Sequence, residues 1–393
     1  MTHVEQQSAG KREPRPTLLI LSFSPIARDA RVLRQIELFR ERYAITTVGF
    51  GPAAPGVVRH HEIRVPEGRA RRLRGYIEAV LLRAHLYRLM LWSDPLVTAT
   101  RRAVRGATFG RILANDIYTV PIALRLVPGS AVHADLHEYY PGLHDDQATW
   151  RRLRQPYLTW LVEEFGPRAA SATTVGEEIA ERYRSHGVEA AVVVNAPSQQ
   201  PFSPGAVSSP LRLVHAGAAL STRRIENMMR AVAASTADIQ LSVLLTPNQP
   251  AYVTELEQLA RDLGPRVVMI PPVDHHELLA TLNTFDVGIH VLPATVTNQA
   301  LALPNKFFDF VQSRLGIIVG PTPGMAGLVR ERGLGAVTEG FEVDHIRAVL
   351  DDLTPERVAR WKAAADTASS ALSSATQLPV WTAAIDALSP ARP

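Results

Sequence analysis

The sequence alternates short apolar runs with helical segments in two successive series, and this pattern restricts the possible folds more than any other feature. The first series predicts buried parallel strands at residues 18–22, 44–49, 112–114, 131–134, 172–175 and 191–194. Helical segments such as 32–39 and 177–185 lie between several of these strands. Strand–helix alternation of this kind implies right-handed crossovers and a doubly wound sheet.

A second series follows a linker. Residues 195–210 are rich in Pro, Ser, Gln and Gly, a composition typical of linkers. Beyond them, strands are predicted at 211–216, 239–246, 267–270, 287–292 and 316–319, helices at 224–234, 252–263, 276–282 and 307–314, and closing helices at 355–373 and 379–388. We therefore predict an α/β protein with two Rossmann-like domains, residues 1–200 and 205–375, that face each other across a cleft. A C-terminal helix of about residues 376–393 is predicted to pack back on the first domain.

Composition excludes several classes of site. The chain of 393 residues contains no cysteine, so disulfides, thiolate metal sites and cysteine nucleophiles are excluded. Nothing in the sequence resembles a signal peptide, and no stretch is apolar for long enough to span a bilayer. We expect a soluble, cytoplasmic protein.

Positive charge is concentrated in the first half. Residues 1–200 have a balance of +7 and the remainder −3, within a net charge of +4. The excess lies mainly in residues 59–105, where arginines alternate with large apolar residues in a helical pattern. Such a stretch can lie on an anionic membrane surface or bind an anionic or lipid-linked acceptor. The alternative is a helix packed on its own domain with a solvated arginine face. Nucleic-acid binding is disfavoured, because aromatics are few and no recognition module is visible.

The loops that follow strands of the first domain carry two groups of polar residues. Ser24, Arg28 and Asp29 follow the first strand, where a dinucleotide-binding domain would show G-x-G-x-x-G. The absence of that motif weighs against a dehydrogenase. The second group is Asp135, His137 and Glu138, at the end of the strand at 131–134. A histidine there can orient an acceptor hydroxyl or a reacting sugar, and a neighbouring carboxylate can raise its pKa. The alternative is a histidine that serves only the structure of the loop.

The second domain repeats this arrangement. A loop of small residues containing Gly217 ends in Arg223 and Arg224 at a predicted helix start, which suits a pyrophosphate, although the two arginines can also be ordinary surface residues. Val273 lies in a loop whose backbone can contact a nucleobase edge, and Asp274 is a plausible helix cap. The pairs His137 with Glu138 and His275 with His276 lack the spacing expected of a metal site.

A further helix start combines Pro304, Asn305, Lys306 and Asp309. The chain has only three lysines, so Lys306 stands out against its preference for arginine. Free N–H groups at a helix start attract phosphates, and Asp309, one turn later on nearly the same face, can accept hydrogen bonds from a ribose diol. The alternative is a capping segment on an ordinary amphipathic helix.

These segments together resemble the retaining, nucleotide-sugar-dependent glycosyltransferases of family 4, which have the GT-B fold. The resemblance covers nearly the whole chain. It is strongest in LPNKFFD at 303–309 and PTPGM at 321–325, with support from ARDARV at 27–32, DLHE at 135–138, NAP at 195–197 and FDVG at 285–288.

The resemblance implies that the C-terminal domain binds the nucleotide-sugar donor and the N-terminal domain the acceptor. By position, Asp309 matches a carboxylate that binds the ribose, Lys306 and Asn305 approach the diphosphate or the sugar, and His137 lies near the reacting sugar. Arg223 or Arg224 would neutralise the diphosphate, so no divalent metal or other cofactor is expected. The chain departs from the family at residue 301, where a leucine replaces a glutamate that many members carry.

The expected function is transfer of a hexose-type sugar from a UDP- or GDP-sugar to the hydroxyl of a glycan, a lipid-linked or a small-molecule acceptor. We expect this reaction to belong to bacterial cell-envelope or exopolysaccharide synthesis, or to natural-product synthesis. Two alternatives remain open at this point: a UDP-sugar 2-epimerase of the same fold, and a catalytically silent GT-B subunit that activates a partner.

Overall fold

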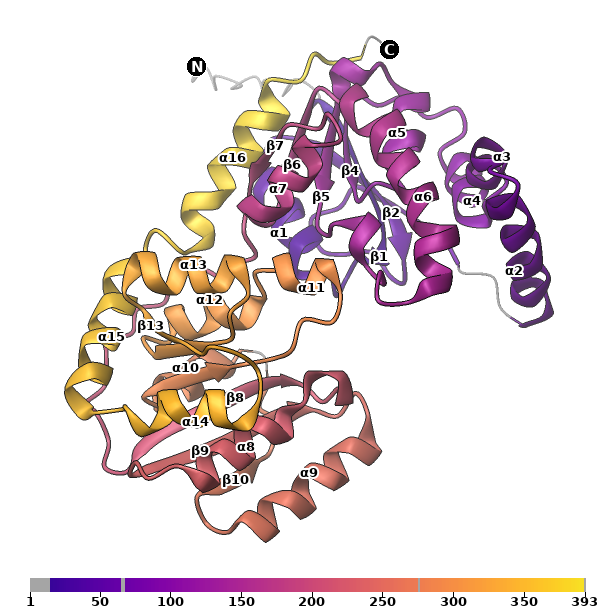
Figure 1. Cartoon of the computed structure of the whole chain (residues 1–393). Helices are drawn as coiled ribbons and strands as arrows, with labels where there is room; N and C mark the ends of the chain where they lie inside the picture. The colour runs from indigo at the N-terminus through magenta and orange to yellow at the C-terminus, as the bar shows by residue number, and fades with distance from the viewer. Residues whose placement is uncertain (1–14, 65–67, 275, 392–393) are drawn as a thin grey trace, which may run out of the picture.

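The first of two α/β domains is built on a parallel sheet. The computed structural model describes residues 15–64, 68–274 and 276–391, and its two domains lie one above the other in Figure 1. The first sheet has seven strands in the order β3-β2-β1-β4-β5-β6-β7. These strands are β1 (Thr17–Pro25), β2 (Ala44–Phe50), β3 (Arg59–Glu62), β4 (Arg111–Asn115), β5 (Val132–Leu136), β6 (Ser171–Thr174) and β7 (Ala190–Val192). The order reverses between β1 and β4, and ligands of open α/β sheets bind at the carboxyl ends of strands at such a point.

Helices cover both faces of this sheet. They are α1 (Ala30–Phe39), α2 (Gly68–Arg83), α3 (Tyr87–Trp92), α4 (Pro95–Ala103), α5 (Val120–Leu126), α6 (Ala148–Phe165) and α7 (Glu177–Arg184), with 3₁₀ turns η1 (Gly129–Ala131), η2 (Tyr140–Gly142) and η3 (Gly166–Arg168). Alternate side chains of β1 divide the core, because Leu19 and Leu21 pack with α3–α7 whereas Leu18 and Ile20 pack with α1. A strand buried on both faces is apolar at nearly every position, and this is the signal by which β1 was predicted.

The second domain has a six-stranded parallel sheet in the order β10-β9-β8-β11-β12-β13. Its strands are β8 (Leu211–Ala218), β9 (Ile239–Thr246), β10 (Val267–Ile270), β11 (Val287–His290), β12 (Gly316–Val319) and β13 (Gly335–Val337). The helices are α8 (Ile225–Ala234), α9 (Pro250–Leu263), α10 (Leu278–Asn283), α11 (Thr297–Leu301), α12 (Asn305–Gln312), α13 (Pro323–Arg332), α14 (Val343–Asp351) and α15 (Pro355–Ala368), with the 3₁₀ turn η4 (Ser221–Arg223) before α8. Here the strand order reverses between β8 and β11, which places a second ligand-binding edge in the cleft.

The chain crosses between the domains twice. The first crossing follows β7, and the second joins α15 to the last helix, α16 (Ser374–Asp386). The two crossings lie side by side, because the Ser374 N–H donates to the carbonyl oxygen of Pro197 at 2.9 Å. Helix α16 runs along the edge of the first domain in Figure 1, and its Trp381 and Ile385 are buried with the residues of β1 and α1.

Three local predictions were wrong. Residues 59–62, part of the stretch predicted as helical, form the edge strand β3, and residues 65–67 of that stretch lie outside the described residues. The strand β13 was not predicted. Asp274 does not cap a helix, because α10 begins only at Leu278 with Glu277 in the cap position.

Candidate active site

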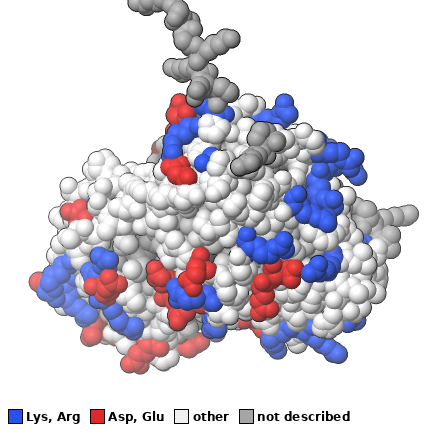
Figure 2. Space-filling model, turned by 90° about the horizontal axis from the view of Figure 1, so that it is seen from above, with Lys and Arg blue, Asp and Glu red and all other residues white. Residues whose placement is uncertain are grey.

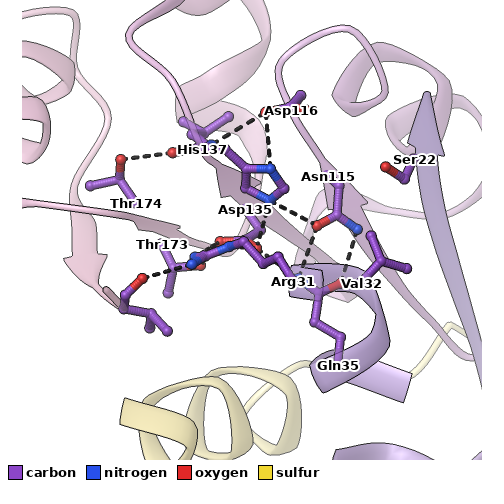
Figure 3. A network of polar contacts seen from close by, with 12 residues as sticks. Ser22, Arg31, Val32, Gln35, Asn115, Asp116, Asp135, His137, Thr173 and Thr174 are labelled. Atoms are coloured by element: carbon purple, nitrogen blue, oxygen red, sulfur yellow. Dashed lines mark hydrogen bonds and ion pairs between the residues drawn. The ribbon is translucent and has the colours of Figure 1, made fainter. Parts of the chain in front are cut away.

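A buried polar network occupies the carboxyl ends of β4, β5 and β6 (Figure 3). At its centre, Asp135 is fully buried and accepts from Arg31 Nε at 2.8 Å and from Arg31 Nη2 at 2.6 Å. The same carboxylate also accepts from Gln35 Nε2 at 2.7 Å and from Thr173 Oγ1 at 2.6 Å. Burial acts to raise the pKa of Asp135, but Arg31 and His137 outweigh it and hold that pKa well below its usual range. Asp135 is therefore an ionised group that holds its neighbours in place.

The start of α1 fixes Arg31. Asp29 caps the helix, since its carboxylate accepts from the Arg31 N–H at 3.0 Å and the Val32 N–H at 3.2 Å. The Arg31 guanidinium lies over the ring of Trp381 at 4.6 Å and also donates to the carbonyl oxygen of Val193 at 2.7 Å. A planar guanidinium matches this set of partners in a way that an ammonium would not.

His137 lies at the cleft side of this network. Its Nε2 is 3.1 Å from Asp135 Oδ2 and 3.2 Å from Asn115 Oδ1, so this nitrogen carries a proton. The backbone N–H donates to Asp116 Oδ1 at 3.3 Å, and Nδ1 is 3.8 Å from the same oxygen. Burial acts to lower the pKa of His137, but Asp116 and Asp135 outweigh it and raise that pKa. These carboxylates therefore stabilise the cationic form of the imidazole relative to a free histidine, and Nδ1 is the ring nitrogen nearest Asp116.

Glu138 belongs to a contact between the domains. Its carboxylate accepts from the side-chain amide of Asn298 in α11, and the side-chain oxygen Oδ1 of Asn298 accepts from the Tyr139 N–H at 2.8 Å. Nearby, the Thr297 N–H donates to Asp145 at 2.9 Å. Burial raises the pKa of Glu138, and the Asn298 hydrogen bond opposes that shift. In this arrangement Glu138 joins the two domains beside the cleft.

The second domain contributes a pocket at the carboxyl ends of β8, β11 and β12. Arg223, His290, Gln299, Pro304, Thr322 and Met325 are among its lining residues. Among the described residues, His215 Nε2, His290 Nδ1 and Thr322 Oγ1 are buried polar atoms with no hydrogen-bond partner. His215 Nδ1 lies 2.9 Å from the carbonyl oxygen of Ile289, so Nδ1 donates and the buried Nε2 is left as an acceptor.

Two cations, Arg223 and Lys306, lie near enough to act on both histidines. Burial lowers the pKa of His215 to about 4 and holds that of His290 well below its usual range, and Arg223 and Lys306 act in the same direction on both rings. Both histidines are therefore neutral at pH 7. A Cβ at Gly217 would lie 3.2 Å from Arg223 Nη1, so only glycine leaves this guanidinium its present position without crowding. Buried polar atoms without partners cost free energy, which a polar ligand in this pocket would remove.

Lys306 and Asp309 form a pair in the first turns of α12. Lys306 Nζ lies 2.9 Å from Asp309 Oδ2, as the spacing of three residues predicts. The carboxylate is mostly buried, whereas the ammonium is partly exposed. Pro304 is the residue before the helix and lines the pocket.

Of the predicted donor-binding residues, only Arg223 and Pro304 line this pocket, and Lys306 and Asp309 lie outside its lining together with the others. Arg224 turns away to Glu342, with 3.3 Å between Arg224 Nη1 and Glu342 Oε1, so Arg223 is the arginine of the pocket. Asn305 is exposed and Val273 is half-buried in the core beneath. In the first domain, Arg28 is exposed and Ser24 Oγ contacts Ser22 Oγ at 2.8 Å.

Sequence reasoning missed three residues of these sites. His290 was placed inside a strand predicted to continue to residue 292, whereas β11 ends at His290 and leaves its ring at the sheet edge. Asp116 has a φ of 67° after β4, a conformation that the sequence does not reveal. Asn298 contacts residues about 160 positions away in the sequence, and no local sequence pattern predicts that contact.

One group of exposed side chains also has the composition of a metal site. Asp274, His276 and Glu277 can place ligand atoms within 4.8 Å of one another. Exposed acidic groups are common without an ion, so this group is not evidence for one. His275, which the sequence analysis considered together with His276 as a possible metal-binding pair, lies outside the described residues.

Solved structures match the chain over nearly its whole length. HepE from Anabaena, in complex with UDP, has a TM-score of 0.68 at 14% identity and covers 95% of this chain and 100% of its own. Sucrose-phosphate synthase from Thermosynechococcus elongatus has a TM-score of 0.68 at 12% identity, with coverage of 94% and 98%. WaaG, a glycosyltransferase involved in lipopolysaccharide biosynthesis, has a TM-score of 0.61 at 12% identity, with coverage of 93% and 98%.

The fold is GT-B. Two Rossmann-like domains with the observed strand orders confirm the fold class predicted from the sequence. No protein-family model and no curated protein matches the sequence. At these identities the structural similarity establishes the fold, and the activity has to be argued from the residues of the site.

Proposed function

We propose that the protein is a glycosyltransferase that moves a sugar from a nucleotide-sugar donor to a hydroxyl acceptor. The observation that carries this proposal is the pocket of the second domain, where buried polar atoms of His290 and Thr322 have no partner among the described residues and Arg223 supplies positive charge. A diphosphate linked to a sugar offers both the negative charge and the hydroxyl groups that such a lining needs.

The proposed donor is a UDP- or GDP-sugar. HepE, which shares the fold, has been crystallised with UDP and with UDP-glucose, which supports a uridine nucleotide. In our proposal, Arg223 and Lys306 neutralise the diphosphate and Asp309 accepts from the ribose hydroxyls. Leu301, the residue that replaces a glutamate of the family, lies in α11 and packs into the core of the first domain. In our proposal His290 and Thr322 therefore provide the hydrogen bonds to the sugar.

We propose transfer with retention and without a protein base. The bond between the anomeric carbon and the diphosphate breaks, the acceptor oxygen bonds to the same face of that carbon, and the acceptor proton passes to the departing diphosphate. Asp135 and Glu138 are both bonded to other side chains, which supports a mechanism in which neither removes the proton. In this proposal Arg223, which lines the pocket, and Lys306 of the neighbouring helix stabilise the leaving group, so no divalent metal or other cofactor is required.

The proposed setting is bacterial cell-envelope, exopolysaccharide or natural-product synthesis. WaaG, which shares the fold, is involved in lipopolysaccharide biosynthesis, and this supports the first of these settings.

A direct test uses the purified protein, UDP, GDP, TDP and ADP, and the corresponding sugars. One nucleoside diphosphate is expected to bind with micromolar affinity by calorimetry, in EDTA as well as in Mg²⁺. Its nucleotide sugar should be hydrolysed slowly when no acceptor is present, and the released sugar should keep its anomeric configuration. Conversion to an epimer, or no binding of any nucleotide, would contradict the proposal.

His137 is expected to act on turnover more than on donor binding. The His137→Ala variant should lower kcat about 100-fold, with the Kd for the nucleoside diphosphate changed less than threefold. Because the pKa of His137 is raised in the folded protein, its cationic form is present at low pH and lost as pH rises through that raised pKa. The wild-type rate should therefore fall on that alkaline limb, and the limb should be missing in the variant. A loss of donor affinity alone would contradict this role.

We also propose peripheral contact with an anionic membrane. No helix in the described part of the chain is long and apolar enough to cross a bilayer. Helix α2 buries Leu81 and Leu82 but exposes Tyr76, Ile77 and Val80, and Leu86 and Leu89 are exposed just beyond it. Exposed arginines of the same region include Arg83, Arg101 and Arg102. Blue side chains are frequent on the right of Figure 2, where α2–α4 lie. Apolar residues beside cations are typical of interfacial helices.

Vesicle sedimentation tests this contact. The protein should sediment with phosphatidylglycerol vesicles and much less with phosphatidylcholine vesicles. The double variant Ile77→Ser, Val80→Ser should lose most of this binding, whereas Val268→Ser, at an exposed valine of the other domain, should keep it. Equal binding of both variants would contradict the assignment of this surface.

A further inference from the structure

A second pocket, in the first domain, lies beside His137. It has a volume of about 410 Å³ and opens at the carboxyl ends of β1, β2 and β4. Its walls are mainly aromatic and aliphatic, and the five aromatic residues are Phe23, Phe50, Tyr118, Tyr140 and Tyr157. Met90 and Leu91 of α3 and Leu96 and Val97 of α4 close the other side. This volume is in the range of pockets that bind small organic molecules.

The acidic, amide, threonine and arginine side chains of this pocket already have protein partners, so the tyrosine hydroxyl groups are the main hydrogen-bonding groups left for a ligand. Asp94 caps α4, since it accepts from the Leu96 N–H at 2.8 Å. Asn115 exchanges hydrogen bonds with Gln35 at 2.9 and 3.0 Å and contacts His137. Thr119 Oγ1 donates to the carbonyl oxygen of Asn115 at 2.7 Å, and Arg154 pairs with Glu78.

This arrangement disfavours a bare sugar as the occupant. A saccharide that enters a pocket must replace the hydrogen bonds of its hydroxyl groups to water, and groups that are already paired offer few replacements. Aromatic rings and aliphatic side chains instead gain by covering an apolar body.

Asp116 connects this pocket to the proposed reaction centre. Its side chain lines the pocket and also accepts from the His137 N–H at 3.3 Å. It is held with a φ of 67°, a region that residues other than glycine adopt rarely, with aspartate among the types that tolerate it. A hydroxyl group at the inner end of a bound molecule would meet Asp116 next to His137.

We infer that the acceptor is an apolar alcohol or phenol, with an aromatic or isoprenoid body in this pocket and its hydroxyl group at Asp116. This inference rests on the proposed function and names the class of its second substrate. The acceptor oxygen attacks the anomeric carbon as the sugar–diphosphate bond breaks, and its proton passes to the diphosphate. The product is an apolar glycoside.

Calorimetry with three probes tests the inference. The probes are 4-methylumbelliferone for a phenol, citronellol for an isoprenoid alcohol and methyl α-D-glucopyranoside for a saccharide. We expect one or both apolar probes to bind at micromolar Kd and the glucoside not to bind. The two apolar probes distinguish an aromatic from an isoprenoid acceptor.

Two variants locate the binding. Leu96→Trp fills the pocket and should weaken binding of the apolar probe at least tenfold, and Phe50→Leu, which removes an aromatic face, should weaken it about threefold. Leu89→Trp, at an exposed leucine that does not line the pocket, is the matched control and should bind normally. Binding of the nucleoside diphosphate should be unchanged in all three variants, which also shows that they are folded.

Preference for the glucoside, or apolar binding that neither Leu96→Trp nor Phe50→Leu changes, would overturn the inference. If the wild type binds an apolar probe in this pocket but no nucleotide, the proposed function fails and the pocket assignment stands.

Discussion

Asp135→Asn is expected to lower the free energy of unfolding by about 3–5 kcal/mol, because it leaves the buried Arg31 guanidinium without its ionised partner. Both groups are almost fully buried, and the carboxylate accepts from Arg31, Gln35 and Thr173. An asparagine fills the same volume but carries no charge and offers one acceptor oxygen instead of two. Urea denaturation at pH 7 measures the change, with the slope against urea used to check that unfolding remains two-state.

A surface pair provides the matched control. Asp386→Asn removes the ionised partner of Arg42, and the two groups lie 2.5 Å apart with both side chains partly exposed. This change should lower the free energy of unfolding by less than about 1 kcal/mol. The effect of pH separates the two further. Because the folded-state pKa of Asp135 is well below its usual range, its contribution is complete above pH ~4 and is lost as pH falls toward the folded-state pKa. The wild type should therefore lose stability in acid more steeply than Asp135→Asn. Equal costs for the two variants would show that the network around Asp135 does not hold the domain together.

Lys306→Ala is expected to reduce kcat/KM for the nucleotide sugar about 100-fold, an effect typical of removing one group that stabilises a charged leaving group. Lys306 is close enough to act on the pKa values of His215 and His290, and its ammonium contacts Asp309. Removing it takes away positive charge where the proposed diphosphate lies. Release of nucleoside diphosphate in a coupled assay measures the rate.

The fold of this variant should be intact, because a partly exposed pair of residues within one helix contributes little to stability. Its thermal midpoint is expected to change by less than about 3 °C. Arg330→Ala, at an exposed cation of the same domain that does not line the pocket, should retain normal kcat/KM. Normal turnover by Lys306→Ala would remove Lys306 from the site and leave Arg223 as its cation.

Most strands were predictable because their residues are buried on both faces. The strands β9, β10 and β12 have the predicted bounds, and β1 and β8 extend only a few residues further. The strand β3 was not predictable in this way. Its sequence, Arg-His-His-Glu, is polar, and it forms because its backbone pairs with β2 at the edge of the sheet. Apolar runs identify strands in the interior of a sheet, whereas edge strands depend on a neighbour that the local sequence does not show.

The sites were predictable as segments but not as individual side chains. Small differences in where a helix begins decide which of Arg28 and Arg31, or of Arg223 and Arg224, turns inward. In both cases the structure selects one arginine, Arg31 for Asp135 and Arg223 for the pocket. Lys306 and Asp309 were the exception, since three residues along a helix fix their relative position.

The first crossing between the domains is bonded to the same guanidinium that holds Asp135. Asn195 begins the linker, and its Oδ1 accepts from Arg31 Nη1 at 3.0 Å and from Arg34 Nη2 at 2.8 Å. The second crossing is bonded to the first through Ser374 and Pro197. A rotation of one domain about these two connections would therefore pull on Arg31, and through Asp135 on His137. A change in the opening of the cleft would in this way also change the orientation of the histidine.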